Sequence, residues 1–152
     1  MSYRAFVVNK SGDEFSMGVR HLDESDLPAG DVTIRVEWSS VNYKDGLACS
    51  PTGRVVRSYP MTPGVDLAGK VVSSTDSRYS PGQEVVVIGY DIGVAHPGGF
   101  AELARVPGDW VCPCQKDSRP RNRWPLGRQD SRPRFRSTRW NAAGFLQPTA
   151  RS

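Results

Sequence analysis

Short apolar runs separated by turn-forming residues constrain the fold of this chain more than any other feature of its sequence. Val32–Trp38 places apolar side chains at every second position, the period of a half-buried strand. Glu84–Gly89 is almost continuously apolar and of strand length, and Phe100–Val106 is read as the last strand. Gly and Pro clusters such as Ser80-Pro81-Gly82-Gln83 fall between the runs. The pattern predicts a mainly β fold, a small β-barrel or sandwich, with hardly any helix.

Three further parts of the chain predict local structure. Tyr3–Val8 is an apolar run that ends in a turn cluster, and Phe15–Val19 resumes the alternation, so the two predict a hairpin. Asn42–Ala48 contains no proline and predicts one or two helical turns. Val65–Val72 predicts a strand in which Gly69 marks a bulge or a close approach of two backbones.

Polar and amphipathic side chains gather where the alternation of Val32–Trp38 stops. The segment Ser39-Ser40-Val41-Asn42-Tyr43-Lys44-Asp45 follows directly. The strand therefore delivers Asn42 and Tyr43 to an edge or a cleft of the fold. A tyrosine after a strand is often a packed ring with a hydrated hydroxyl, and the residues alone leave this interpretation open.

Charge divides the chain in two. Residues 1–112 carry 10 Lys and Arg against 14 Asp and Glu, a net charge of −4, whereas residues 113–152 carry 10 against 2, a net charge of +8. We expect a domain at 1–112 and a disordered, arginine-rich tail at 113–152, because the tail lacks helical or strand period and has little apolar content.

The location expected from composition is the cytoplasm. The chain has no run of 18 apolar residues and no basic region followed by an apolar core at its start. Three cysteines, an odd number, fit a reducing compartment. Cys112-Pro113-Cys114 is too tightly spaced for a usual zinc pair, so no metal site is expected.

Four motifs of the chain stand out by their order and spacing. They are Ser39-Ser40-Val41-Asn42-Tyr43-Lys44-Asp45-Gly46-Leu47-Ala48, Pro63-Gly64-Val65-Asp66-Leu67-Ala68-Gly69, Gly89-Tyr90-Asp91-Ile92-Gly93 and Gly98-Gly99-Phe100-Ala101-Glu102. Together they resemble the GroES-like N-terminal domain of zinc-independent medium-chain dehydrogenases/reductases, of the quinone oxidoreductase and acrylyl-CoA reductase type. The resemblance covers residues 3 to 112 and implies a partly open β-barrel with short helical turns.

The resemblance also implies that zinc takes no part. Zinc enzymes of this superfamily have a cysteine where this chain has Asn42, and a His-Glu pair where it has Val65 and Asp66. An amide and an isopropyl group cannot replace a thiolate and an imidazole as zinc ligands.

The activity implied by the resemblance is hydride transfer from NADPH to a polarised double bond, in an enoyl thioester such as acrylyl-CoA or in a quinone. The nicotinamide supplies the hydride and the protein orients the reactants. Tyr43 and Asn42 are the candidate catalytic residues: Tyr43 as a hydrogen-bond or proton donor to the enolate, Asn42 as a contact to nicotinamide or substrate. The candidate cofactor-binding residues are Asn42, Tyr43, Lys44 and Asp45, of which Lys44 and Asp45 are expected to orient the segment. The intact relatives imply small-molecule substrates and a possible homodimer.

Three other polar residues receive simpler interpretations. Asp66 is expected to cap a turn or to satisfy backbone donors. His96, next to Pro97, is expected in a loop, and His21 on the surface.

The cofactor-binding domain of the resembled enzymes has no counterpart in this sequence. Such a domain carries a Gly-rich turn that holds the pyrophosphate at a helix N-terminus. No Gly-x-Gly-x-x-Gly occurs in the 152 residues. We expect the chain to be a truncated, inactive N-terminal fragment of the oxidoreductase, in which the Rossmann domain is absent.

The basic tail has three interpretations. It is a disordered segment, or an arginine-rich arm that binds nucleic acid, or the product of a one-base shift of the reading frame near Val111. In the shifted frame, the third base of each codon from Arg123 onward is read together with the first two bases of the next codon. One amino-acid sequence that this frame allows is Met-Ala-Leu-Gly-Thr-Ala-Gly-Phe-Thr-Ala-Ala-Leu-Ser-Leu-His, followed by one ambiguous residue and Leu-Glu. Since tryptophan has one codon, Trp124-Pro125 forces Ala and Trp140-Asn141 forces Glu. The recovered phrase resembles the start of the Rossmann half of the same family, so the frameshift is the favoured interpretation.

Overall fold

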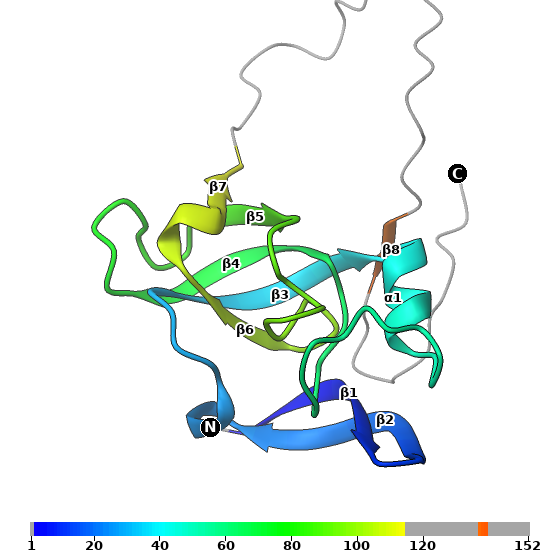
Figure 1. Ribbon diagram of the computed structural model, residues 1–152. Helices are drawn as coiled ribbons and strands as arrows, with labels where there is room; N and C mark the ends of the chain where they lie inside the picture. Colours follow the sequence, from blue (N-terminus) through cyan, green and yellow to red (C-terminus); the bar gives the residue numbers. More distant parts are fainter. Residues whose placement is uncertain (1, 115–136, 140–152) are drawn as a thin grey trace, which may run out of the picture.

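The computed structural model describes residues 2–114 and 137–139, and the fold is mainly β (Figure 1). The short helical elements are the 3-10 turns η1 (Glu24–Asp26) and η2 (Gly108–Trp110) and the helix α1 (Tyr43–Ala48). The strands are β1 (Ser2–Ser11), β2 (Glu14–Asp23), β3 (Val32–Ser40), β4 (Asp66–Ser74), β5 (Glu84–Ile88), β6 (Leu103–Val106), β7 (Val111–Pro113) and β8 (Ser137–Arg139). No helix in these described ranges is long and apolar enough to cross a membrane.

The predicted hairpin is confirmed. Strands β1 and β2 pair antiparallel from Ser2↔Asp23 to Ser11↔Glu14 and form a two-stranded sheet. The hairpin lies below the main sheet in Figure 1 and is joined to the rest of the domain through β1, where Phe6 N donates to Phe100 O at 2.8 Å. Strand β2 is largely exposed because its side chains have little to pack against beyond β1.

The second sheet has the order β6-β3-β4-β5-β7, and β8 pairs with β3. The described strands of this sheet all pair antiparallel with their neighbours. Among the described strands β6 and β7 are the two ends of this order and do not pair with each other, so the sheet does not close into a barrel. The partly open architecture expected from the family resemblance is therefore confirmed.

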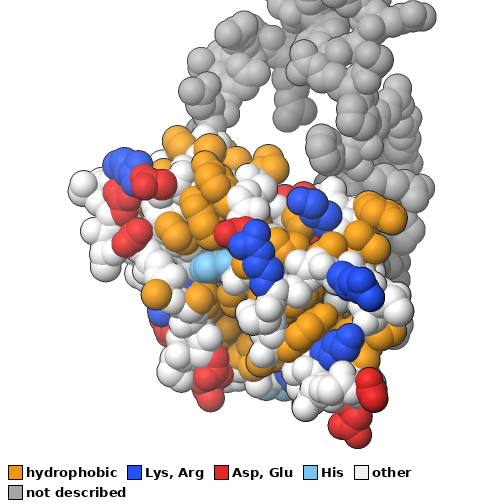
Figure 2. All heavy atoms as spheres, in the orientation of Figure 1, with side chains coloured by type: hydrophobic (Ala, Val, Ile, Leu, Met, Phe, Trp, Pro, Cys, Tyr) orange, Lys and Arg blue, Asp and Glu red, His pale blue; other side chains and the backbone are white. Residues whose placement is uncertain are grey.

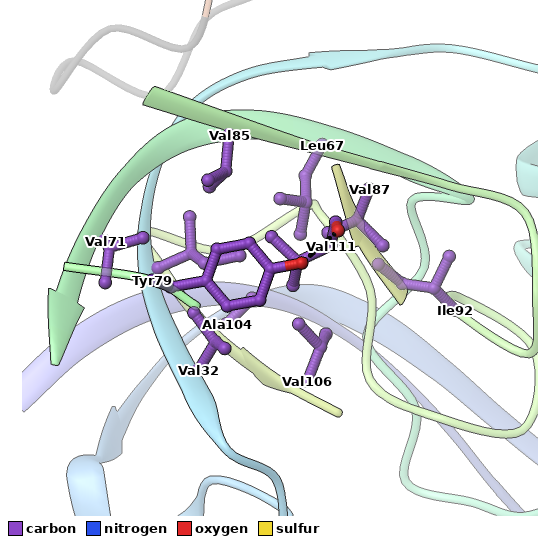
Figure 3. Packing of buried hydrophobic residues seen from close by; sticks show 11 residues of the cluster. Val32, Leu67, Val71, Tyr79, Val85, Val87, Ile92, Ala104, Val106 and Val111 are labelled. Carbon is purple, nitrogen blue, oxygen red and sulfur yellow. Dashed lines mark hydrogen bonds between the residues drawn. The ribbon is translucent and has the colours of Figure 1, made fainter. Parts of the chain in front are cut away.

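The main core fills the space enclosed by this sheet (Figure 3). Tyr79 lies across the cluster and its hydroxyl donates to the carbonyl of Val111. A smaller cluster joins the hairpin to β6. The buried side chains of the main cluster are Val32, Ile34, Leu67, Val71, Tyr79, Val85, Val87, Ile92, Ala104, Val106 and Val111.

Gly69 has the role that the sequence predicts. A Cβ atom placed on it would lie 2.0 Å from the carbonyl oxygen of Arg35 in β3. The register of β3 against β4 shifts close by, between Val36 and Trp38. The pairing therefore needs a residue without a side chain at this point of β4.

The last predicted strand begins later than expected, and two short strands were not predicted. The predicted strand starts at Phe100, whereas β6 starts at Leu103, because Phe100 and Ala101 pair with β1 instead of β3. The strands that were not predicted are β7 and β8. The helical turns expected at Asn42–Ala48 are confirmed as α1. The disorder expected for 113–152 concerns mostly residues 115–136 and 140–152, which lie outside the described residues.

Candidate functional site

The candidate site is built where β3 runs into α1. Strand β3 ends at Ser40, and Asn42 is the extended residue that caps the helix. The backbone N–H of Asn42 donates to the carboxylate Oδ2 of Asp45 at 2.8 Å. The helix start and the strand end are thus fixed to each other by a residue of the first helical turn.

Asp45 is a structural anchor. It is 1% exposed, and its other carboxylate oxygen accepts hydrogen bonds from the backbone N–H groups of Gly64 and Val65, at 2.9 and 3.1 Å. Asp45 therefore ties α1 to the segment that enters β4. Of the two roles predicted for it, cofactor contact and orientation of the segment, this placement favours orientation.

Asp66 and Ser40 hold the side chain of Asn42. Oδ1 of Asp66 accepts from the backbone N–H of Ser40 at 2.7 Å, and Oδ2 accepts from the Ser40 hydroxyl and from Nδ2 of Asn42, the latter at 3.1 Å. Nδ2 of Asn42 also donates to Oγ of Ser40 at 3.0 Å. These two hydrogen bonds of Nδ2 fix the plane of the Asn42 amide and direct its oxygen away from Asp66.

Tyr43 and Lys44 stand on the exposed side of α1. Tyr43 is 82% exposed, so within the described part of the chain its ring is not packed. Lys44 is exposed as well. The structure thus brings Asn42, Tyr43 and Lys44 together at one helix start, with Asp45 underneath.

The role of Asp66 exceeds what the sequence predicts. It satisfies a backbone donor as expected, but it also orients the side chains of Ser40 and Asn42, which lie 26 and 24 residues earlier in the chain. In the sequence, the only sign of this role is that Ser40 is polar. That does not show that Asp66 is its hydrogen-bond partner.

The histidines lie where the sequence predicts. His21 is exposed on β2. His96 lies in the loop after β5, with Nδ1 3.0 Å from the carbonyl oxygen of Pro97 and its ring edge on Trp110 at 5.2 Å. Because a carbonyl only accepts, Nδ1 is the donor in this contact.

Metal-binding groups do not gather in the part of the chain that the structure describes. No three His, Cys, Asp or Glu side chains there lie close enough to hold an ion. The thiols of Cys49, Cys112 and Cys114 are free. A hollow of about 420 Å³, lined by Lys70, Gly82, Gln83, Glu84 and Cys114, contains none of the candidate site residues.

A family model and several curated proteins match this chain. A family model described as the alcohol dehydrogenase GroES-like domain matches residues 28–116. A protein of Escherichia coli (strain K12) named as a probable acrylyl-CoA reductase is 48% identical over 108 residues, which are 71% of this chain and 33% of that protein. A Bacillus subtilis (strain 168) protein named as a putative quinone oxidoreductase is 45% identical over 111 residues, 73% of this chain and 34% of that protein.

Two solved structures share the fold. The yhdH oxidoreductase of Salmonella enterica in complex with NADP is 48% identical with a TM-score of 0.70, over 72% of this chain and 34% of that one. The Bacillus subtilis protein yhfP with NAD bound is 44% identical with a TM-score of 0.72, over 74% of this chain and 34% of that one. The chain thus spans about a third of the length of the curated relatives it matches.

Proposed function

Because the chain belongs to the medium-chain dehydrogenases/reductases through its alcohol dehydrogenase GroES-like domain, we propose that it is the substrate-side part of an NADPH-dependent reductase of activated double bonds. The substrate is an enoyl thioester such as acrylyl-CoA, or a quinone. The observation that carries the proposal is the Asn42–Tyr43 helix start, held from below by Asp45 and from the side by Asp66. The names of the relatives and the NADP found in one of their structures support the same chemistry.

The residues at this helix start suit such a reaction. The nicotinamide, when bound, supplies the hydride. The amide of Asn42 is held in one orientation, and its oxygen faces the backbone N–H of Asp45 in the capping box. Because a carbonyl oxygen has two lone pairs, it is still suited to accept from a carboxamide N–H or from a substrate donor. The exposed phenol of Tyr43 is suited to donate a hydrogen bond or a proton to the oxygen that becomes an enolate. Zinc has no role in this account, since Asn42 and Val65 stand where a thiolate and an imidazole would be needed.

The proposal includes a shifted reading frame after Trp110. The regrouping applied from Arg123 also admits Val-Pro-Leu-Pro-Glu-Gly-Leu-Ser in place of Val111–Ser118, without a single arginine. The +8 segment 113–152 would then be an out-of-frame product, and the original frame would encode the nucleotide-binding domain. Without the Gly-rich turn of such a domain, the 152-residue chain is expected to bind NADPH poorly and to have no measurable turnover.

A reconstruction tests the function directly. Two proteins are compared for NADPH oxidation with acrylyl-CoA and with a quinone: the 152-residue chain, and the product of the locus after the frame is restored. We expect activity from the second and none from the first. The Tyr43→Phe and Asn42→Ala variants of the restored protein should lower kcat/KM by about tenfold or more. Turnover by the 152-residue chain, or unchanged activity of both variants, would contradict the proposal.

A second candidate function is favoured by the net charge of +8 on residues 113–152. In this case the β domain is a scaffold and the arginine-rich segment binds nucleic acid through phosphate contacts. It predicts nucleic-acid affinity that falls steeply with salt and that is lost when residues 113–152 are deleted. Binding alone does not support this function, because any cationic segment attracts nucleic acid. A preference for particular nucleic-acid sequences would support it.

A further inference from the structure

The hairpin leaves one strand edge unpaired. Among the described strands β2 pairs only with β1, and the two form a sheet of their own. In Figure 1 β2 is the outer strand of the hairpin, on the side away from the main sheet. It is 10 residues long, contains no proline and keeps a regular register against β1. A long, regular edge of this kind is a template for pairing with another strand.

Alternate residues of β2 direct their backbone groups at this free edge. Phe6 and Val8 of β1 bond outward, to the segments that precede β6 and β4. Val19 and Met17 lie opposite these two residues, and opposite residues of an antiparallel pair direct their backbone groups either at each other or away from each other. The backbone groups of Met17 and Val19 therefore face away from β1, and they have no hydrogen-bond partner in the part of the chain that the structure describes. By the same alternation, the outward-facing residues of β2 are Phe15, Met17, Val19 and His21.

The side chains on one face of β2 are apolar and exposed. Met17 is 55% and Val19 51% exposed. The half-buried ring of Phe15 shares their face, because side chains alternate along a strand. Strand β1 adds Phe6 to this face, opposite Val19. Apolar surface beside an unpaired strand edge indicates an interaction site.

The opposite face of β2 carries charges of both signs. Glu14 lies at the turn end of the hairpin, where Figure 2 shows acidic side chains, and Arg20 lies further along the strand on the same face. Both residues are exposed. Neither forms an ion pair within residues 2–114 and 137–139. Both charges are thus available to a partner strand.

A second copy of β2 fits both faces at one register. The two strands run antiparallel about a two-fold axis at Met17. Glu14 of each copy then lies opposite Arg20 of the other, and Phe15 lies opposite Val19. The two Met17 residues face each other, with their outward backbone groups directed at one another.

Charge distinguishes this register from its neighbours. With the axis moved to Gly18, Glu14 lies opposite Leu22, so the ion pairs are lost. With the axis moved to Val19, Glu14 lies opposite Glu24, a residue of like charge.

We propose that β2 is an interface between two copies of this chain, in which the β2 strands pair antiparallel about a two-fold axis at Met17. The two hairpins then form one continuous sheet, with an apolar row on one face and symmetric Glu14–Arg20 ion pairs on the other. The inference does not depend on the proposed function, because none of the candidate site residues lies on the hairpin.

The test is analytical ultracentrifugation of the 152-residue chain over a range of concentrations at low ionic strength, where exposed charges are least screened. We expect a reversible equilibrium between monomer and dimer. Glu14→Arg and Arg20→Glu each place like charges opposite one another and should raise the dissociation constant of the dimer about tenfold or more. Arg35→Glu is the matched control, at an exposed position of β3 that forms no ion pair among the described residues, and should leave this constant unchanged.

Mixing the variants tests the register. An equimolar mixture of Glu14→Arg and Arg20→Glu has opposite charges at both positions of the mixed dimer, so it should dimerise as tightly as the parent chain. A mixture of Glu14→Arg with Arg35→Glu has the same net charges without this match and should stay weak.

Amide hydrogen exchange locates the interface. The amides of Met17 and Val19 should exchange fast in dilute samples, which are monomeric, and become protected as the concentration rises. Gly18 is the internal reference, because its N–H faces β1 and should be protected at every concentration. The NMR spectrum of each variant also reports whether it is folded.

Four results would overturn the inference. These are a monomer at every concentration, a dimer that Glu14→Arg and Arg20→Glu weaken no more than Arg35→Glu does, a mixture of the first two that is no tighter than either alone, and protection of Met17 that does not depend on concentration. The last result would mean that another part of the same chain, and not a second copy, covers β2.

Discussion

Two carboxylates, Asp45 and Asp66, determine how the residues of the candidate site are presented. Each accepts hydrogen bonds from groups that are distant in sequence, 19 to 26 residues away. The sequence identified Asn42 and Tyr43 because an alternating strand stops just before them. It did not identify the Ser40–Asp66 contact, because alternation assigns a face to a residue but not its partner across the sheet.

Removal of the Asp45 carboxylate should destabilise the domain. Asp45→Ala leaves three backbone N–H groups without their acceptor, so we expect a loss of about 2–4 kcal/mol in the free energy of unfolding. Denaturant unfolding measures it. Glu14→Ala, at an exposed position of β2, is the control and should stay within about 0.5 kcal/mol of the parent. A loss no larger than that of the control would refute the anchoring role.

The ion pair between Arg4 and Glu102 should make stability depend on pH. Hydrogen bonds from the Arg4 side chain, 2.6 Å from Glu102 in the closest contact, lower the pKa of Glu102 below its usual 4.5. Because the pKa of Glu102 is lower in the folded state, its ionised carboxylate stabilises the domain at pH values above the unfolded-state pKa. This contribution is lost as the pH falls through the folded-state pKa. The urea midpoints of the parent and of Glu102→Gln should therefore differ at pH 7, and the difference should shrink as the pH falls through the folded-state pKa of Glu102. A difference that does not change with pH would contradict this assignment.

At the scale of the elements, the strands differ in how far the sequence predicts them. Most strands were predictable from period and turn signals alone. The start of β6 was not, because Phe100 and Ala101 bond to a distant strand, β1, whose position the local pattern does not encode. Strand β7 is too short to show a period, which explains why it was missed.

Gly69 should be intolerant of a side chain. In Gly69→Ala the added Cβ would meet the Arg35 carbonyl at 2.0 Å, so the strands must separate, and we expect a loss of about 2–3 kcal/mol in thermal or denaturant unfolding. Gly18→Ala is the matched control, since a Cβ there meets nothing within 4 Å. It should be neutral or slightly stabilising. Similar losses in both variants would show that the close approach is not the cause.

At the scale of the whole molecule, apolar side chains are exposed around the candidate site. Ile88 is 68% and Tyr90 61% exposed, and Ile88 pairs directly with Asp66. Val41, next to Ser40, is exposed as well. The proposed function explains this surface as one that a nucleotide-binding domain covers, which agrees with the apolar patch expected for interdomain contacts.

Replacing the exposed apolar side chains should improve solubility without a loss of stability. Ile88→Lys removes a side chain that contributes little to the core, so we expect a higher concentration limit before precipitation and an unfolding midpoint close to that of the parent. Val87→Lys, at the buried neighbouring position, is the contrasting variant and should unfold the domain. Unchanged solubility in Ile88→Lys would argue against an exposed docking surface.

The nucleotide sequence of the locus tests the central claim most directly. It is read from the codon of Gly108 to several hundred bases past the codon of Ser152. The account predicts that a one-base shift after Trp110 opens a frame that continues through Val-Pro-Leu-Pro-Glu-Gly-Leu-Ser into a Gly-rich dinucleotide-binding domain. A locus in which no shifted frame continues beyond residue 152 would contradict it, and the arginine-rich segment would then be a genuine part of the protein.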